Sequence, residues 1–298
     1  MINKTGIFII ISLIGSFLLV QCTSQKEIKH NICSTKYPII LVHGIAFRDD
    51  VPLLKYWSKI PKKLKQNGAI VYLAHQDAFN SHIESALQLK NRVTEILEET
   101  GAEKVNIIAH SKGGIEARYM ISKLNMHDKV ASLTTLATPH RGSALADTIF
   151  DFLKKTNFTD KALLIAKKYA KIIGDKQPNA FLAGTELTME YMQHFNKSVQ
   201  DIPSVYYQSY GGVVSEKYPA WHIRIQYKIM QKSEGDNDCI VSKKSYKWGD
   251  FKGVVKSSDD FGISHFDIVG MRYISSVSSF DANYFMINIV KELKDKGF

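Results

Sequence analysis

The segment 105–114, VNIIAHSKGG, constrains this chain more than any other stretch of its sequence. Its first half is rich in β-formers, and the sequence GGIEARYMISKL that follows favours a helix. Ala109 and Gly113 place small residues two positions before and two positions after Ser111, as a nucleophile elbow of the A-x-S-x-G type requires. We therefore predict that Ser111 is a nucleophile at the tip of a strand. The alternative is an ordinary strand–helix turn in which Ser111 only caps the helix.

Strand and helix patterns alternate around this segment. Apolar runs in 37–44, 69–74 and 130–138 predict buried strands, and helical periodicity in 52–68 and 81–100 predicts helices between them. This alternation predicts right-handed βαβ units, and hence an α/β fold with a doubly wound, mainly parallel sheet. A chain of 298 residues, 45% of them hydrophobic, is long enough for one such domain, which we expect over residues 37–298.

The formal charge of +10 is spread over many lysine-bearing segments. The sequence has no pattern typical of an RNA- or DNA-binding domain, so we do not expect a nucleic-acid partner. The charge instead favours a weak attraction to anionic surfaces, including lipid head groups.

Residues 1–21 have the pattern of an export signal. Lys4 precedes a continuous apolar run that closes on Cys22, as in a bacterial lipoprotein signal. We expect Cys22 to be the lipid-modified mature N-terminus and residues 22–36 to be a tether, so that the protein is exported and lipid-anchored to the cell envelope or outer membrane. Gln21 stands where such a signal normally has a small residue, so an uncleaved membrane anchor and a freely secreted form are the alternatives.

Two further cysteines, Cys33 and Cys239, allow two interpretations. In an exported protein they could form a disulfide that ties the 239 region to the N-terminal segment, or they could remain buried free thiols.

The strand pattern stops between residues 144 and about 200, where we expect a helical lid or cap. Within it, the segment 161–173, KALLIAKKYAKII, combines an apolar stripe with four lysines. This pattern predicts either a lid helix whose apolar face closes an acyl pocket and opens at a lipid surface, or a core-packing helix with a solvated lysine face.

Two turns after the serine carry the groups that would activate it. Residues 235–242, GDNDCIVS, place carboxylates on one turn, and SHFD places His265 on the other. The order serine, acid, histidine is that of α/β-hydrolases. His140 is the rival base, although its position directly after a strand and Pro139 is more natural for a structural histidine.

The backbone supplies the remaining groups of such a site. The N–H of Ile45, just past the first strand, and the N–H of Lys112, next to the nucleophile, are expected to form the oxyanion hole. Loss of one such donor typically costs roughly 2.7–4 kcal/mol of transition-state stabilisation. His43 is expected to brace this loop by hydrogen bonding.

Taken together, YPIILVHG, VNIIAHSKGGIEARYM, LTTLATPHRGS, LTMEYMQHFN, NDCIVS and SHFD, in this order, resemble the bacterial triacylglycerol lipases of the true-lipase family, the Pseudomonas and Burkholderia type. The likeness runs from about Tyr37 to the C-terminus. It implies an α/β-hydrolase fold and the hydrolysis of triacylglycerol or related acyl esters through an acyl-enzyme on Ser111, with His265 as the base. A lipid acyltransferase or a short-chain esterase would use the same groups, whereas a non-catalytic surface-binding protein would need a broken triad.

Matched residue by residue, the resemblance assigns the acid to Asp238, because the family has Asn-Asp-Gly where this chain has NDC. Asp236 is the second candidate for the acid. Asp267 matches a calcium ligand of the family, and Glu216 is the nearest candidate for its partner carboxylate. The chemistry itself requires no cofactor, so calcium would be structural.

Lys112 departs from the family, which has a glutamine after the nucleophile. The resemblance also brings a lipase-specific foldase as a candidate partner, beside an acyl-ester substrate and a membrane or lipid surface.

Overall fold

The computed structural model describes residues 31–49, 51, 55–156, 159–271, 274 and 279–298. The expected export signal and Cys22 lie outside the described residues. The centre of the fold is a six-stranded sheet in the order β2-β1-β3-β4-β5-β6, with every neighbouring pair parallel. The strands are β1 Ile39–Val42, β2 Val71–Leu73, β3 Val105–His110, β4 Val130–Leu136, β5 Tyr206–Gly211 and β6 Asp250–Val254. The predicted doubly wound α/β fold is confirmed, and β6 adds a strand that the sequence patterns did not indicate.

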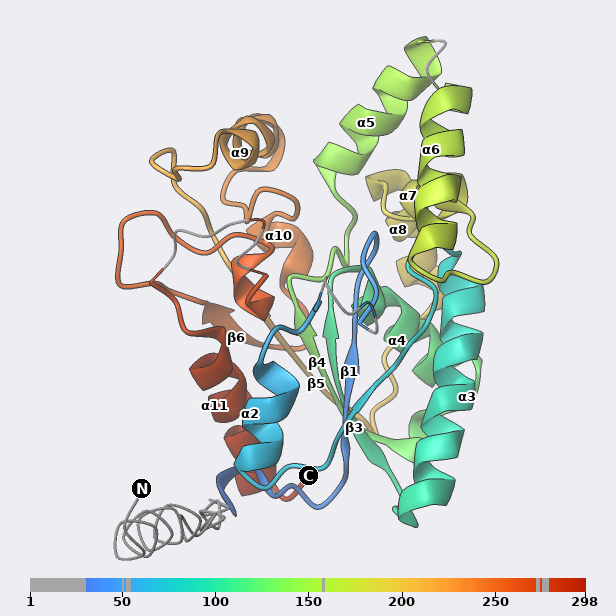
Figure 1. The fold of residues 1–298 in the computed structure, drawn as a ribbon, viewed down its shortest axis with the longest axis vertical. Helices are drawn as coiled ribbons and strands as arrows, with labels where there is room; N and C mark the ends of the chain where they lie inside the picture. Colours follow the sequence, from blue (N-terminus) through green and yellow to red (C-terminus); the bar gives the residue numbers. More distant parts are fainter. Residues whose placement is uncertain (1–30, 50, 52–54, 157–158, 272–273, 275–278) are drawn as a thin grey trace, which may run out of the picture.

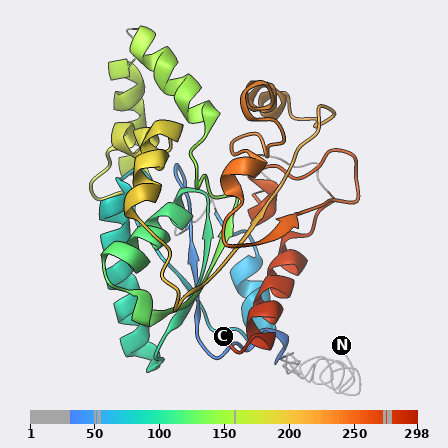
Figure 2. The same ribbon diagram turned by 180° about the vertical axis from the view of Figure 1, so that it is seen from behind.

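Alternate residues of β1 divide the core between the two faces of the sheet. Ile39 and Leu41 pack with α2 (Ile60–Gln66) and α11 (Ala282–Asp295), whereas Ile40 and Val42 pack with α3 (His82–Thr100) and α4 (Lys112–Lys123). Figures 1 and 2 show these two pairs of helices on opposite sides of the sheet. Each fully buried aliphatic side chain contributes about 1.5–3 kcal/mol. The strand that leads into the site is therefore held firmly on both faces.

The local sequence sets the limits of α3. The Ser81 hydroxyl accepts a hydrogen bond from the Glu84 N–H at 3.1 Å, which satisfies one donor of the first turn. At the other end Gly101 has φ 65°, and its N–H donates to the Leu97 carbonyl at 2.9 Å. The helix predicted over 81–100 is confirmed in both of its ends.

Helices cover the edge of the sheet at which the parallel strands end. Between β4 and β5 the chain forms α5 (Ala144–Lys155), α6 (Thr159–Ile172), α7 (Ala180–Thr185) and α8 (Met189–Ser198). Between β5 and β6 it forms α9 (Trp221–Glu234) and α10 (Lys243–Tyr246). Figure 1 shows α5, α6 and α9 together at this end of the molecule, and α5 contacts α9 directly. Short 3-10 turns at Asn31–Cys33, His127–Lys129 and Asp267–Val269 complete the described elements.

The structure agrees with the second interpretation of Cys33 and Cys239, in which both remain buried free thiols. Cys33 and Cys239 are both buried and unpaired with each other. Burial raises the pKa of Cys33 to about 11 and raises that of Cys239 well above its usual value. Both thiols are therefore protonated at neutral pH, and structural rather than reactive.

Within the described residues no helix combines the length and the apolar character that a membrane crossing requires.

Candidate active site

Ser111 sits at a sharp turn between β3 and α4. Its backbone has φ 55° and ψ −131°, a conformation that non-glycine residues rarely adopt and that costs on the order of 1–3 kcal/mol. Two glycines allow the close packing around it. A Cβ on Gly44 would lie 2.7 Å from the Ser111 Cβ, and one on Gly113 would lie 2.4 Å from the His43 carbonyl oxygen. The small residue expected after the serine is thus needed because α4 begins directly against the end of β1.

Asp238 and His265 are joined by two hydrogen bonds. The His265 Nδ1 lies 2.9 Å from the Asp238 Oδ2, and the His265 N–H donates to the Asp238 carbonyl at 2.8 Å. The other carboxylate oxygen accepts from the N–H groups of Ile240 at 3.0 Å and Val241 at 2.7 Å. These bonds fix the carboxylate and leave the far nitrogen of the imidazole, Nε2, for another partner. Asp236, the second candidate for the acid, is exposed and has no such contact with His265.

Ser111, His265 and Ile45 line the same cavity, whose volume is about 420 Å³. Side chains from α5, α6 and α7 form one wall, and side chains from the 240–271 region form another. Apolar groups dominate this lining: Ala46, Phe47, Phe79, Leu145, Ile149, Phe150, Leu153, Ala162, Leu163, Ala166, Phe181, Leu187, Ile240, Val241, Phe266 and Met271. The residues expected to be chemically active therefore open into an apolar chamber.

The two expected oxyanion donors are available. In the described part of the chain, neither the Ile45 N–H nor the Lys112 N–H donates a hydrogen bond to a protein group. Lys112 is the first residue of α4, where the helix leaves its N–H groups unpaired and carries partial positive charge. Lys112 directly follows Ser111, and Ile45 follows Gly44, whose backbone packs against the Ser111 side chain. Both N–H groups can therefore donate hydrogen bonds to a negative oxygen that develops beside Ser111.

The Lys112 side chain turns away from the cavity into a buried polar network. Its Nζ contacts the Glu116 Oε1 at 2.5 Å, with both side chains almost fully buried. The Glu116 Oε2 accepts from the Gln76 Nε2 at 2.9 Å, and the same amide group also donates to the His43 carbonyl at 2.9 Å. The His43 Nε2 in turn lies 2.9 Å from the Gln76 carbonyl, so His43 braces this loop as expected.

His140 is committed to structural contacts. Its Nε2 lies 3.0 Å from the Thr135 hydroxyl, and its ring stacks on Trp248 with centroids 4.9 Å apart. Its Nδ1 lies 3.3 Å from an Arg118 nitrogen. Burial and the nearby guanidinium groups of Arg118 and Arg141 lower the pKa of His140 well below its usual value. It does not line the cavity of Ser111, so the structure separates this rival base from the nucleophile.

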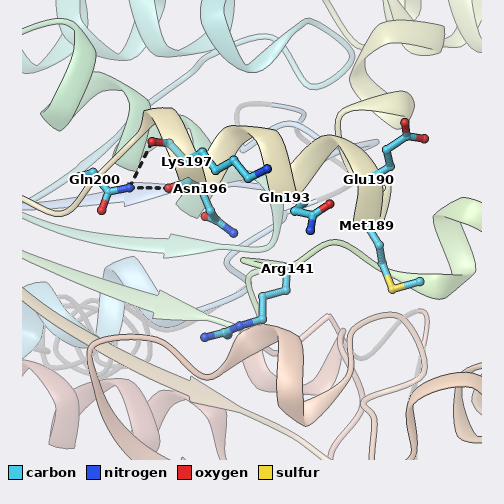
Figure 3. A pocket seen from close by; sticks show the side chains of 7 residues that line it. All are labelled: Arg141, Met189, Glu190, Gln193, Asn196, Lys197 and Gln200. Carbon is cyan, nitrogen blue, oxygen red and sulfur yellow. Dashed lines mark hydrogen bonds between the residues drawn. The ribbon is translucent and has the colours of Figure 1, made fainter.

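A second hollow lies outside this cavity, between α8 and the loop that carries Arg141 (Figure 3). Its lining comprises Met189 and six residues with polar or charged side chains: Arg141, Glu190, Gln193, Asn196, Lys197 and Gln200. The Arg141 guanidinium is already bound to backbone carbonyls, at 2.9 Å from Lys244 and 2.7 Å from Lys247. The lining holds no nucleophile beside a base, so we place the chemistry in the apolar cavity.

The surroundings of Asp267 do not fit the calcium site that the resemblance implied. Its Oδ2 accepts from the Tyr218 hydroxyl at 2.8 Å, the Ser264 N–H at 2.9 Å and the Ser264 hydroxyl at 2.7 Å. Calcium needs several converging oxygen acceptors, whereas these groups are donors. Among the described residues no three metal-binding side chains cluster, and Glu216 is exposed. Hydrogen bonds from Tyr218, which the sequence interpretation did not single out, tie down the loop of His265 instead.

The parallel sheet, the serine at its sharp turn and the Asp238–His265 pair beside it define an α/β hydrolase. The sequence model of the palmitoyl protein thioesterase family matches residues 38–258. Triacylglycerol lipase 2 of Saccharomyces cerevisiae is 31% identical over 266 residues, which cover 82% of this chain and 75% of that protein. The chain therefore belongs to the palmitoyl protein thioesterase family. Its relation to triacylglycerol lipases is the one that its motifs predicted.

Further similarities agree with this assignment. A triacylglycerol lipase of Vibrio cholerae is 39% identical over 147 residues, 49% of this chain and 46% of that protein. The crystal structure of the Bacillus licheniformis lipase BlEst2 in its mature form matches with a TM-score of 0.60 at 21% identity, over 80% of this chain and 88% of that one. That structural match supports the fold, and the sequence relatives support the coarse class of a lipid-ester hydrolase.

Proposed function

We propose that this protein is a serine carboxylic-ester hydrolase that cleaves triacylglycerols or related long-chain acyl esters. The observation that carries the proposal is the Asp238–His265 pair, joined at 2.9 Å, because its His265 lines one apolar cavity with Ser111. An apolar chamber of this kind suits an acyl chain, because each methylene that leaves water contributes about 0.8 kcal/mol.

The proposed reaction proceeds in two halves. His265 takes the Ser111 proton through Nε2 while the serine oxygen attacks the ester carbonyl, and the Ile45 and Lys112 N–H groups bind the resulting oxyanion. The tetrahedral intermediate collapses, the protonated His265 gives its proton to the departing alcohol, and the acyl group stays on Ser111. Water, deprotonated by His265, then attacks the acyl-enzyme and releases the fatty acid. Asp238 holds the Nδ1–H throughout and stabilises the charged imidazole.

Long-chain thioesters are the second candidate substrate. The match to the palmitoyl protein thioesterase family favours them, and the same attack on a carbonyl would release a thiol instead of an alcohol. Transfer of the acyl group to a lipid alcohol in place of water is a third outcome of the same acyl-enzyme.

We propose a lipid surface as the physical partner of this end of the molecule. Apolar side chains of α5, α6 and α9 are exposed around the cavity: Ile149, Phe152, Leu164, Ile165, Ile172, Trp221 and Ile225. All four lysines of α6 are exposed too: Lys161, Lys167, Lys168 and Lys171. On α6 the cavity-facing residues Ala162, Leu163 and Ala166 occupy the other face of the helix. This division supports the lid interpretation, because one face covers the chamber while the other can meet a membrane.

We further propose that the protein is exported and held at the cell envelope or outer membrane by a lipid on Cys22, with secretion as the alternative. The support is the apolar run before Cys22 in the sequence. A lipase-specific foldase is a candidate partner in its production.

The function is tested by comparing the wild type with Ser111→Ala on emulsified triacylglycerols of increasing chain length, on p-nitrophenyl esters and on palmitoyl-coenzyme A. We expect hydrolysis of long-chain esters that rises at the oil–water interface, and loss of activity in the variant at unchanged circular dichroism. Full activity in Ser111→Ala would refute the proposal, faster cleavage of the thioester would favour the second candidate, and acyl transfer to an added alcohol would favour the third.

A further inference from the structure

Three loops that carry the reacting groups meet at two neighbouring side chains, Tyr56 and His110. The Gly44 N–H donates to the Tyr56 hydroxyl at 2.8 Å, and the same hydroxyl lies 2.5 Å from the His110 Nδ1. Gly44 directly precedes Ile45, His110 directly precedes Ser111, and the His110 ring lies 4.5 Å from the His265 ring between centroids. Tyr56 and His110 are almost fully buried, at 2% and 1% exposure.

The hydrogen positions in this cluster follow from the donors. The Gly44 N–H donates to the Tyr56 oxygen, and the 2.5 Å contact places the hydroxyl as the donor to the His110 Nδ1. Burial and the neighbouring His265 lower the pKa of His110 well below its usual value, so the ring is neutral and carries its one hydrogen on Nε2. That Nε2 is buried, with no well-formed hydrogen bond in the described part of the chain.

We propose that Tyr56 and His110 are positioning residues. They hold three segments in fixed positions relative to one another: the oxyanion loop at Gly44–Ile45, the nucleophile turn at Ser111 and the loop of His265. The inference rests on the proposed function, because it takes Ser111 as the nucleophile and the Ile45 N–H as an oxyanion donor.

The packing at Gly44 explains why the relative position of these segments matters to the reaction. A Cβ on Gly44 would lie only 2.7 Å from the Ser111 Cβ and 2.8 Å from the Tyr56 hydroxyl oxygen, so the backbone here touches both groups. A displacement of Gly44 therefore moves the Ile45 N–H relative to the carbonyl that Ser111 attacks. Oxyanion donors are effective only within about 2.7–3.1 Å of the developing charge. The Tyr56 hydroxyl binds the Gly44 N–H directly, so its loss removes one restraint on this backbone.

Tyr56→Phe is the first variant, because it removes the hydroxyl and keeps the ring. With a soluble p-nitrophenyl ester we expect kcat to fall roughly 10- to 100-fold while KM stays within about twofold, the result of weakening an interaction made in the transition state. The affinity for an alkyl boronic acid, whose tetrahedral adduct on Ser111 fills the oxyanion hole, should fall by the same factor. The affinity for an unreactive fatty alcohol should stay unchanged.

Two substitutions of His110 separate its hydrogen bond from its bulk. His110→Asn places an amide oxygen near the position of Nδ1, and we expect kcat within about threefold of the wild type. His110→Leu offers no acceptor and should lose as much kcat as Tyr56→Phe. The double variant Tyr56→Phe/His110→Leu should be no worse than either single variant, because the two side chains act as one unit.

Tyr207→Phe is the matched control. Its hydroxyl accepts from the Ile202 N–H at 3.2 Å, so the variant also removes a hydroxyl that binds a backbone donor, but Tyr207 lies outside the cavity of Ser111. We expect wild-type kinetics.

Three results would overturn the inference: Tyr56→Phe with kcat and boronate affinity within twofold of the wild type, His110→Asn as impaired as His110→Leu, or an equal loss in Tyr207→Phe. Ser111→Ala in the same assay separates this failure from failure of the proposed function. If Ser111→Ala is inactive while Tyr56→Phe is normal, only the positioning role is refuted.

Discussion

The His265 imidazole and the Asp238 carboxylate face each other at 2.9 Å, and the His265 N–H binds the Asp238 backbone carbonyl at 2.8 Å. The side-chain bond orients the ring, and the backbone bond ties together the two loops that carry these residues. We therefore expect Asp238→Asn to lower kcat for ester hydrolysis by about 10³–10⁴-fold, because the amide favours the wrong tautomer of the histidine.

Asp236→Asn is the control for that variant, measured with the same ester by initial rates. Asp236 is exposed and pairs with Lys243 at 3.6 Å, so its removal should leave kcat within about twofold of the wild type. A larger loss in Asp236→Asn than in Asp238→Asn would show that the acid has been assigned to the wrong carboxylate.

For the buried pair Lys112–Glu116, removal of one charge should destabilise the protein far more than removal of both. Glu116→Gln leaves the Lys112 ammonium without its partner in the interior, and we expect the free energy of unfolding to fall by about 3–5 kcal/mol. The double variant Lys112→Met/Glu116→Leu removes both charges and should recover most of this loss. Urea unfolding followed by circular dichroism measures both. A Glu116→Gln variant within 1 kcal/mol of the wild type would contradict the proposed cost of the unpaired charge.

The sequence predicted the fold and the sharp turn at Ser111 because those features depend on local patterns. Apolar runs and β-formers marked β1, β2, β3 and β4, and the small residues around Ser111 marked the turn. In contrast, β6 and α9 were missed. The strand β6 has no fully buried residue and reads DFKGV, so its sequence lacks a hydrophobic signal. Pairing with the edge of β5, which lies far away in sequence, makes it a strand.

The contacts that support the site could not be predicted from the sequence either. The Tyr56 hydroxyl contacts His110, which lies 54 residues further along the chain. The Tyr218 hydroxyl contacts Asp267, which lies 49 residues further along. No spacing rule connects such pairs, because they meet only when the loops at the ends of the strands come together. The same holds for Asp267, for which the resemblance implied a calcium ion: its contact with the Tyr218 hydroxyl could not be read from the sequence.

Removal of metal ions is therefore expected to leave the enzyme unchanged. Because the Asp267 carboxylate accepts from Tyr218 and Ser264, dialysis against EDTA should alter neither the midpoint of thermal unfolding nor the rate of ester hydrolysis. Tyr218→Phe leaves a buried carboxylate one donor short and should lower the free energy of unfolding by about 1–3 kcal/mol. Loss of activity in EDTA that added calcium restores would contradict this account.

Two buried neutral histidines predict a loss of stability in mild acid. The pKa values of His110 and His140 lie well below their usual range, because burial disfavours the charged ring. In the unfolded chain both bind a proton below about pH 6.5, so the unfolded state gains protons that the native state does not. Between pH 7.5 and 5.5 each should lower the free energy of unfolding by about 1.4 kcal/mol.

The variant His140→Phe isolates one of these contributions, since His140 lies outside the cavity of Ser111. Urea unfolding at several pH values gives the free energy of unfolding as a function of pH. Between pH 7.5 and 5.5 the variant should lose about 1.4 kcal/mol less than the wild type. Identical slopes in the two proteins would mean that His140 takes up its proton over the same pH range in the native and unfolded states, which would contradict the account.

The central claim is that Ser111 forms the covalent intermediate, and stoichiometric reaction with a p-nitrophenyl alkylphosphonate tests it most directly. We expect one p-nitrophenolate released per active enzyme, loss of ester hydrolysis in parallel, and the phosphonyl mass on the peptide that contains Ser111, because the adduct mimics the tetrahedral intermediate. A phosphonyl group on a different residue, or full hydrolysis by enzyme already modified at Ser111, would contradict the account.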